Sequence, residues 1–260
     1  MPHLSRDGVR LHYEEQGAGP RSIVFVHGWC CDSTYFAPQA AHFAAGNRCI
    51  SVDLRGHGQS DKPEQDYGIE GFADDVAWLC GQVGVQWPLV VGHSMGGLVA
   101  LSMAGRTAGA PMAIAMLDSP ILPSEGTRGL MAQAAPAFRG PAYKDAARAL
   151  VANSMFIATS DPALKARVVE AMSAAPQYVL ASCWNAILAF DGEAAAKACR
   201  VPALFINAGG IGDTARFRSL CPQLMVEETK GSGHFHQLEV PDQINAMLER
   251  FLAGITAAIM

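Results

Sequence analysis

A serine between glycines is the pattern in this chain that points most directly to chemistry. Ser94 stands in Gly92-His-Ser-Met-Gly-Gly97, directly after an apolar strand-like run and directly before a helical pattern. A sharp strand-to-helix turn holds such a serine in a strained position with its hydroxyl exposed, and it needs small neighbours. The spacing therefore predicts that Ser94 is a nucleophile. A phosphate-binding loop is not supported, because neither Gly-Lys-Ser/Thr nor Gly-x-Gly-x-x-Gly occurs.

A serine hydroxyl needs an adjacent base to become a good nucleophile. The best candidate is His234, which stands in the glycine-rich segment Lys230-Gly-Ser-Gly-His-Phe235 after the last strand-like run. Flexible glycines would let its imidazole reach back over the edge of a sheet. His236 lies two residues further on and is the weaker alternative. We therefore predict a Ser94–His234 pair.

The elements that must position these side chains can be read from the hydrophobic pattern. Short, nearly continuous apolar runs of strand length alternate with helical patterns, which is typical of an open, mostly parallel sheet covered on both faces. The opening segment His3–Tyr13 predicts two short strands around an Asp7-Gly8 turn. The other predicted strands are Ser22–Val26, Cys49–Val52, Leu89–Val91, Met112–Leu117, Ala203–Ile206 and Leu224–Val226. The clearest predicted helices are Phe72–Val83, Gly96–Arg106 and Asp242–Leu252.

The alternation stops between residues 121 and 200. This segment is rich in Ala, Met and Phe and contains five prolines, which predicts several short helices rather than strands. Ligands of open α/β sheets bind outside the carboxyl ends of the strands. We therefore expect residues 121–200 to form a helical cap over the site, with residues 1–120 and 201–260 as the core; the alternative is that these helices merely extend the core.

Four motifs in this order resemble the α/β-hydrolase fold family over nearly the whole chain. They are Val26-His-Gly-Trp29, Asp53-Leu-Arg-Gly-His-Gly-Gln-Ser60, Gly92-His-Ser-Met-Gly-Gly97 and Gly233-His-Phe-x-x-x-Glu239-x-Pro241. The resemblance implies a mostly parallel central sheet with helices on both faces, a helical cap insertion, and an oxyanion hole made by the backbone N–H groups of Trp29 and Met95. It also implies that the side chains of Trp29 and Cys30 line the pocket.

Four further residues of these motifs look structural in this family. The resemblance implies that His27, Asp53, Arg55 and His57 hold loops near the site and take no part in the chemistry.

The acid of the expected Ser-acid-His order has two candidates. Most family members carry it after the seventh strand, but here the aligned position holds Ile211, and Asp213 falls two residues late. A minority carry it directly after the sixth strand, where this chain has Asp118. A carboxylate ending a buried strand needs a partner, which an imidazolium at His234 would provide. We predict Asp118 as the acid, with Asp213 as the alternative.

These residues together predict a serine hydrolase that forms an acyl-enzyme at Ser94 without a metal or organic cofactor. An apolar cap suits a small acyl or aryl ester, and hydrolysis of a lactone, an amide or a carbon–carbon bond stays open. Because position 94 is Ser and not Asp, the resemblance argues against haloalkane dehalogenase and epoxide hydrolase chemistry.

Two alternatives come from other functional classes. The first is the group of cofactor-independent dioxygenases of heteroaromatic rings, which Gly28-Trp-Cys30 and an acid after the sixth strand resemble. In that group a His is expected directly after the serine, where this chain has Met95. The other alternative is a non-catalytic receptor that binds a small molecule.

Composition limits the partners and the compartment. The formal net charge is -5 and no block of Lys and Arg occurs, so neither nucleic acid nor an anionic membrane is an expected partner. Seven scattered cysteines without Cys-x-x-Cys predict buried thiols in a reducing compartment, and no signal peptide is apparent, so we expect a cytoplasmic protein. The longest uncharged window, Ala171–Phe190, predicts a buried helix rather than a membrane span.

Overall fold

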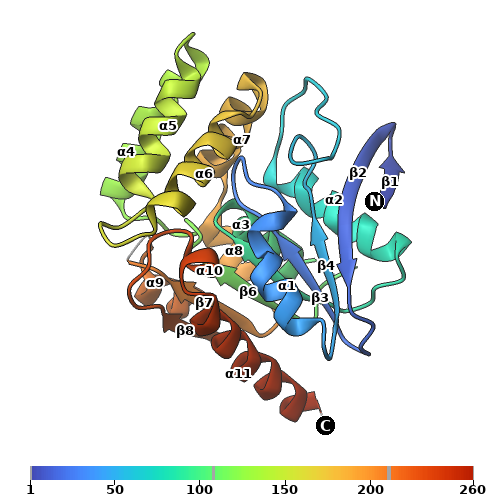
Figure 1. Ribbon diagram of the computed structural model, residues 1–260. Helices are drawn as coiled ribbons and strands as arrows, with labels where there is room; N and C mark the ends of the chain where they lie inside the picture. Colours follow the sequence, from blue (N-terminus) through green and yellow to red (C-terminus); the bar gives the residue numbers. More distant parts are fainter. Residues whose placement is uncertain (1, 107–108, 210–211, 260) are drawn as a thin grey trace.

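A single sheet of eight strands forms the centre of the computed structural model, which describes residues 2–106, 109–209 and 212–259 (Figure 1). The spatial strand order is β1-β2-β4-β3-β5-β6-β7-β8, and β2 runs antiparallel to β4 whereas β3 to β8 are mutually parallel. The strands are β1 (His3–Arg6), β2 (Val9–Gln16), β3 (Ser22–Val26), β4 (Arg48–Val52), β5 (Leu89–His93), β6 (Ala113–Leu117), β7 (Ala203–Asn207) and β8 (Leu224–Glu228). The predicted strands and the hairpin at Asp7-Gly8 are therefore confirmed.

Helices cover both faces of this sheet, as the continuous apolar runs predict. One face packs against α1 and α11 through side chains such as Phe25 and Val91, and the other packs against α2, α3 and α8 through side chains such as Val24 and Val90. The helices of these two layers are α1 (Ala37–Phe43), α2 (Ile69–Gln82), α3 (Met95–Ala104), α8 (Gly192–Ala198), α9 (Thr214–Leu220) and α11 (Pro241–Ile259). The predicted α/β-hydrolase architecture is confirmed.

The segment between β6 and β7 is helical in the described structure. It contains α4 (Glu125–Ala134), α5 (Tyr143–Ser154), α6 (Pro162–Ser173) and α7 (Gln177–Ala189), with a short 3₁₀ helix (Ala137–Arg139) before α5. Figure 1 shows these helices grouped at one end of the sheet, whereas α8 lies against α3 and α9 beside the strands. We call residues 121–200 the insertion; its standing as a separate cap domain stays a prediction.

The uncharged window Ala171–Phe190 is helical, as predicted, but it is divided between two helices and is not a single one. Pro176 has no N–H to donate and begins a new helix, so α6 ends at Ser173 and α7 starts at Gln177. Buried side chains on both helices, such as Met172 and Trp184, join the main core. Within the described ranges, none of the helices is both long and apolar enough to cross a membrane.

The strand ends are tied together where the candidate residues gather. The N–H of Ser94 donates to the Leu117 carbonyl (2.8 Å), and the N–H of Asp118 donates to the Ile206 carbonyl (2.8 Å). These bonds continue the parallel ladders one residue beyond β5 and β6. The carboxyl ends of β5, β6 and β7 therefore form one rigid edge.

Candidate active site

Ser94 sits in the strained turn that its flanking glycines predict. It links β5 to α3 with φ 52° and ψ −117°, a combination that L-residues rarely adopt. A Cβ at Gly92 would collide with the Gly96 carbonyl, and a Cβ at Gly96 would collide with the Val26 carbonyl. The close approach of β3, β5 and α3 is therefore possible only with glycine at both positions, and it turns the Ser94 side chain away from the sheet.

Asp118 and His234 form the strongest polar contact of the site. His234 Nδ1 lies 2.6 Å from Asp118 Oδ2, and Asp118 Oδ1 accepts the Ala208 N–H at 3.1 Å. Burial by itself raises the pKa of Asp118, but the hydrogen bond and charge of His234, the charge of His236 and the Ala208 N–H outweigh it and leave that pKa lowered. Asp118 is therefore held as a carboxylate beside the imidazole.

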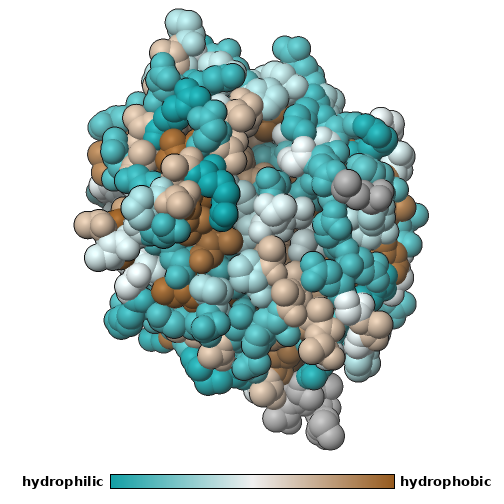
Figure 2. Space-filling model, viewed as in Figure 1, coloured by the Kyte–Doolittle hydropathy of each residue, from teal (hydrophilic) through white to brown (hydrophobic). Residues whose placement is uncertain are grey.

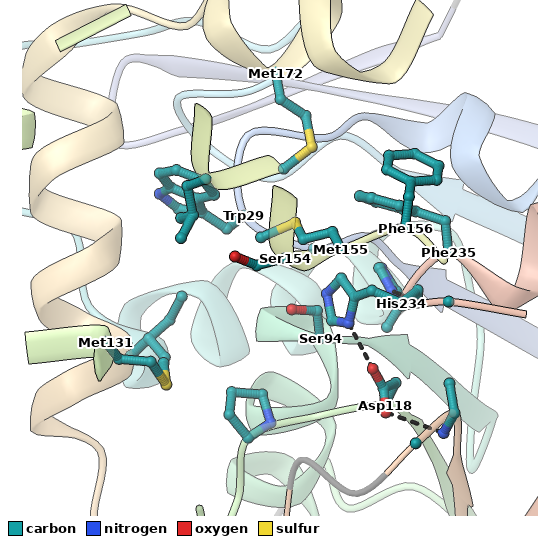
Figure 3. A pocket seen from close by; sticks show the side chains of 18 of the residues that line it. Trp29, Ser94, Asp118, Met131, Ser154, Met155, Phe156, Met172, His234 and Phe235 are labelled. Atoms are coloured by element: carbon teal, nitrogen blue, oxygen red, sulfur yellow. Dashed lines mark hydrogen bonds and ion pairs between the residues drawn. The ribbon is translucent and has the colours of Figure 1, made fainter. Parts of the chain in front are cut away.

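Ser94 and His234 face one another in the same pocket (Figure 3). Because Nδ1 of His234 is engaged by Asp118, Nε2 is the ring nitrogen left for the serine hydroxyl. A neutral imidazole that donates from Nδ1 to a carboxylate presents Nε2 as an acceptor, which is the arrangement that a general base requires. The three predicted residues Ser94, Asp118 and His234 thus come together from three separate loops.

Two backbone segments that could bind an oxyanion lie beside Ser94. Met95 is the first residue of α3, and the first N–H groups of a helix have no partner within it. Gly28, which precedes Trp29, lies so close that a Cβ there would be 3.1 Å from Ser94 Cβ. Trp29 lines the pocket, whereas the side chain of Met95 is fully buried in the core.

The alternative acid, Asp213, lies elsewhere. It is exposed, and its Oδ1 accepts the Arg216 N–H at 2.9 Å, which caps the start of α9. Its side chain is therefore used by a helix N-terminus and does not contact His234. Ile211, the position aligned with the usual acid, lies outside the described residues.

His236, the alternative base, is fully buried below the site. Its Nδ1 lies 3.1 Å from Thr229 Oγ1, and its Nε2 is among the buried side-chain atoms without a hydrogen-bond partner in the described structure. Burial lowers its pKa to about 4, with the positive charge of His234 acting in the same direction and the charge of Asp118 opposing it. Among the two histidines, only His234 reaches the pocket.

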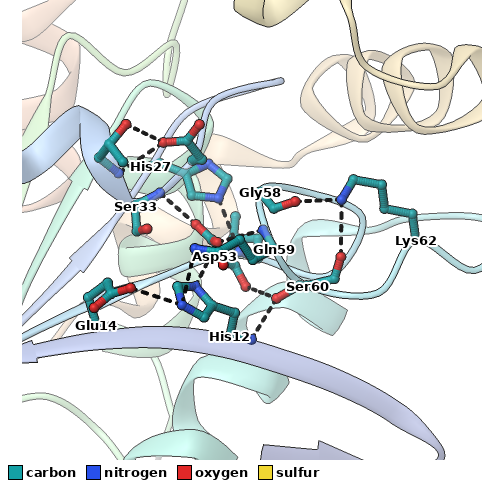
Figure 4. Close-up of polar contacts among 12 residues, drawn as sticks. His12, Glu14, His27, Ser33, Asp53, Gly58, Gln59, Ser60 and Lys62 are labelled. Carbon is teal, nitrogen blue, oxygen red and sulfur yellow. Dashed lines mark hydrogen bonds and ion pairs between the residues drawn. The ribbon is translucent and has the colours of Figure 1, made fainter. Parts of the chain in front are cut away.

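A second polar network lies behind the site and holds its loops (Figure 4). Asp53 accepts the N–H groups of Ser33 (2.6 Å) and Gln59 (2.7 Å) and contacts His12 Nδ1 at 2.8 Å. His27 Nε2 accepts the Leu54 N–H at 3.0 Å. These bonds fold the segment after β4 and tie it to the segment after β3 and to β2.

The other two residues expected to be structural are also bonded away from the pocket. Arg55 forms two hydrogen bonds of 2.9 Å with buried Asp75, and His57 Nδ1 bonds the Arg55 carbonyl at 3.0 Å. Neither Arg55 nor His57 lines the pocket that holds Ser94. Their contacts support the interpretation that they stabilise loops.

The pocket over Ser94 is a cavity of about 400 Å³ with mainly apolar walls. Asp118 is its only ionised lining residue among those described, apart from the titratable histidines His93 and His234. Most of the wall comes from the insertion: Thr127, Leu130, Met131, Leu150, Ser154, Met155, Phe156, Ile157, Met172, Trp184 and Ile187. In Figure 2, apolar surface shows where these helices meet the core.

The two tryptophans of the pocket offer only their ring surfaces. Trp29 Nε1 donates to the Leu180 carbonyl (2.9 Å), and Trp184 Nε1 donates to the Met131 carbonyl (2.9 Å). Their rings pack with centroids 4.9 Å apart. Because both indole donors are already bonded, they cannot bind a polar group of a ligand.

Several residues around the site were not predicted from the sequence, and one expected pocket residue was wrong. Cys31, not Cys30, lines the pocket, because Cys30 adopts a positive φ of 53° that turns the chain. His93 contacts the backbone of His234, and Ser154 supplies a hydroxyl to the pocket wall. The position of His93 directly before Ser94 was a usable signal, whereas nothing local marks Ser154.

Comparison with known proteins matches residues 21–241 to the family described as the alpha/beta hydrolase fold. The structure of an enol-lactonase from Burkholderia xenovorans LB400 superimposes with a TM-score of 0.86 and 25% identity over 97% of this chain and 100% of that one. Est816, described as an N-acyl homoserine lactone degrading enzyme, superimposes with a TM-score of 0.83 and 26% identity over 96% and 100%.

Among curated proteins, the bifunctional esterase/perhydrolase DCH of Acinetobacter calcoaceticus is 34% identical over 121 residues. The match covers 46% of this chain and 44% of that protein. The chain aligns with about half or less of the length of the curated relatives it matches.

Proposed function

Because this chain is a hydrolase-type enzyme that belongs to the α/β-hydrolase fold family, we propose that it hydrolyses small, uncharged carboxylic esters through Ser94. The observation that carries the proposal is the 2.6 Å contact between Asp118 and His234 beside Ser94, at the floor of an apolar cavity. The names of the relatives, an esterase/perhydrolase and two lactone-directed enzymes, support the same reaction class.

The proposed reaction uses each group in a single role. His234 Nε2 takes the Ser94 proton while Oγ attacks the carbonyl carbon, and the N–H groups of Trp29 and Met95 stabilise the oxyanion. His234 then protonates the leaving alcohol as the ester C–O bond breaks. Water repeats the sequence on the acyl-enzyme, which releases the acid and restores Ser94. Asp118 orients the imidazole and stabilises its charged form throughout.

The cavity supports an uncharged, apolar substrate. Its lining contains no Lys, Arg or Glu among the described residues, and its carboxylate Asp118 would repel an anionic substrate. Burying an unpaired charge against apolar walls costs several kcal/mol. An ester or lactone with an apolar acyl or aryl group therefore fits, with residues 121–200 acting as the predicted cap over it.

Covalent labelling tests the nucleophile. An organophosphonate should modify Ser94, and Ser94→Ala should abolish both labelling and turnover of p-nitrophenyl butyrate. Ser154→Ala is the matched control, because Ser154 is another hydroxyl of the same pocket and should leave labelling intact. Labelling that persists in Ser94→Ala, or tight ligand binding without any turnover, would contradict the proposal.

A charged substrate analogue tests the substrate class. The neutral ester p-nitrophenyl butyrate should exceed mono-p-nitrophenyl succinate in kcat/KM by about 100-fold, which corresponds to about 2.7 kcal/mol. Equal turnover of the two esters would show that the apolar lining does not select the substrate.

Cofactor-independent oxygenation of a heteroaromatic ring is the second candidate. The position of Asp118 directly after β6, in contact with His234, favours it, because that acid position and Gly28-Trp-Cys30 resemble such oxygenases. Met95 stands where a His is expected and speaks against it. Oxygen uptake with a hydroxyquinolone substrate, measured beside ester turnover, distinguishes the two activities.

A further inference from the structure

His93 connects the nucleophile turn directly to the loop of the base. It is the last residue of β5, immediately before Ser94, and it is fully buried. Its Nε2 lies 2.9 Å from the backbone carbonyl of His234, and the two imidazole rings have centroids 4.6 Å apart. One side chain thus spans the two catalytic segments.

The protonation state of His93 follows from this contact. A carbonyl oxygen only accepts, so Nε2 carries the hydrogen and donates it to His234. Burial, followed by the charges of His234 and His236, lowers the pKa of His93 well below its ordinary value. Its Nδ1 is buried without a hydrogen-bond partner among the described residues. The neutral ring therefore makes a single strong polar contact, and that contact is with the base loop.

His234 is held at three points by three different elements. Its N–H donates to the Met155 carbonyl (2.9 Å) just after α5, its carbonyl accepts from His93 at the end of β5, and its Nδ1 bonds Asp118 after β6. With both sides of its peptide backbone fixed, the imidazole can turn only about its own side-chain bonds. The His93 bond is the one that ties this residue to the end of β5, directly beside Ser94.

We infer that His93 is a positioning residue, whose Nε2–H holds the backbone of His234 so that its imidazole reaches both Ser94 and Asp118. The inference rests on the proposed function of Ser94 and His234. A displacement of about 1 Å in a catalytic group can lower a rate by about 100-fold. Because His93 and Ser94 are adjacent in sequence, no flexible segment separates them. The bond from His93 to the His234 carbonyl therefore fixes the position of His234 relative to Ser94.

Three substitutions separate the hydrogen bond from simple packing. His93→Phe keeps a buried ring without a donor, His93→Asn keeps an amide that is too short to reach the His234 carbonyl, and His93→Gln places an amide N–H near the position of Nε2. We expect kcat for p-nitrophenyl butyrate to fall about 10- to 100-fold in the Phe and Asn variants with KM within twofold. The Gln variant should recover to within about fivefold of the parent protein.

His236→Phe is the matched control. His236 is an equally buried histidine two residues from the base, but its ring bonds Thr229 rather than His234. This variant should change kcat less than threefold even where it lowers the melting temperature. A loss of kcat as large as that of His93→Phe would show that packing around the loop, and not the His93 bond, is responsible.

Proton NMR gives a readout that does not need turnover. The proton shared by His234 Nδ1 and Asp118 should give a downfield resonance that is sharp in the parent protein and in His93→Gln, and broadened or lost in His93→Phe and His93→Asn. Wild-type kcat or an unchanged resonance in folded His93→Phe or His93→Asn overturns the inference, as does a folded His93→Gln that is as slow as they are. If the parent protein hydrolyses no ester, the proposed function fails while the resonance still decides the role of His93.

Discussion

The two halves of the pocket are built in different ways. The sheet-edge half, which carries Ser94, Asp118 and His234, combines positive φ angles at Ser94 and Asp118 with short hydrogen bonds between strand ends. The insertion half is made of apolar helix faces, and α4 has no fully buried residue at all. Leu130 on α4 is 69% exposed although it lines the pocket.

This difference separates positioning from selection. Strained, hydrogen-bonded residues persist only where the surrounding structure over-determines them, and that rigidity suits groups that must meet within a fraction of an ångström. Apolar helix faces have no such directional demands, so they can shape a cavity without fixing single atoms. We therefore expect substitutions at the sheet edge to change kcat and substitutions in the insertion to change KM or substrate preference.

Asp118, the proposed acid at the sheet edge, should give the largest effect. Asp118→Asn leaves the shape of the site intact but removes the charge that orients and stabilises the His234 imidazole, so kcat for p-nitrophenyl butyrate should fall by about 10³- to 10⁴-fold. Asp213→Asn, which alters only the cap of α9, should stay within about twofold. If Asp213→Asn lowered kcat more than Asp118→Asn, the acid would be Asp213 after β7. The contrast between the two halves of the pocket would then lose its basis.

A charge placed in the insertion should alter preference rather than the chemical step. Met131→Arg introduces a cation into the apolar wall, and we expect it to raise the kcat/KM ratio of mono-p-nitrophenyl succinate to p-nitrophenyl butyrate by about tenfold or more. Gln133→Arg adds the same charge to an exposed position of α4 outside the pocket and should leave that ratio unchanged. An equal shift in both variants would mean that long-range charge, not the wall, sets the preference.

Buried histidines on the core side should make stability fall in mild acid. Burial lowers the pKa of His57 to about 3, so the folded ring stays neutral while the unfolded one, with a pKa of about 6.5, takes up a proton. The contribution of the neutral His57 ring to the free energy of unfolding is complete above pH 6.5 and is lost as the pH falls toward 3. His57→Asn keeps a donor for the Arg55 carbonyl and should reduce the slope of unfolding free energy between pH 4.5 and 6 by ~1.4 kcal/mol per pH unit. Urea titrations at several pH values measure this slope. Equal slopes for the parent protein and His57→Asn would show that the His57 imidazole is charged or exposed in the folded protein.

The exposed rim of the insertion should give the smallest effect. Leu130→Ser removes apolar surface from a side chain that is mostly in water, so the melting temperature should stay within about 1 °C. KM for p-nitrophenyl butyrate should rise about two- to threefold, with kcat unchanged. A large change in kcat would show that α4 helps to align the reacting groups and would blur the division between the two halves.

Local pattern was sufficient for the elements and for two of the three candidate catalytic residues. Continuous apolar runs marked the parallel strands, and the glycines around Ser94 and before His234 marked turns that only small residues permit. It was less successful where two locations were chemically equivalent. Asp118 and Asp213 both follow a strand, and the sequence favoured Asp118 through a family resemblance; the structure has His234 in contact with Asp118 and not with Asp213.

The failures have physical causes, some local and one that acts over a long stretch of sequence. Cys30 was expected in the pocket, but a positive φ at that residue turns Cys31 inward instead. Ala171–Phe190 reads as a continuous apolar stretch, yet Pro176 divides it into two helices. The bond from His93 to the His234 carbonyl spans 141 positions of sequence, so the local pattern could mark His93 as a neighbour of Ser94 but could not indicate its partner.

The sequence by itself determined the fold class, the strained serine turn and the presence of a histidine able to serve it, because backbone sterics and hydrophobic periodicity are local properties of the chain. The tertiary structure alone decided which side chains wall the cavity and how the His234 loop is held, and it brought Asp118, the acid that the sequence favoured, to that histidine. These depend on side chains converging from β5, β6, the β8 loop and the insertion, and only the packed sheet brings those ends to one edge.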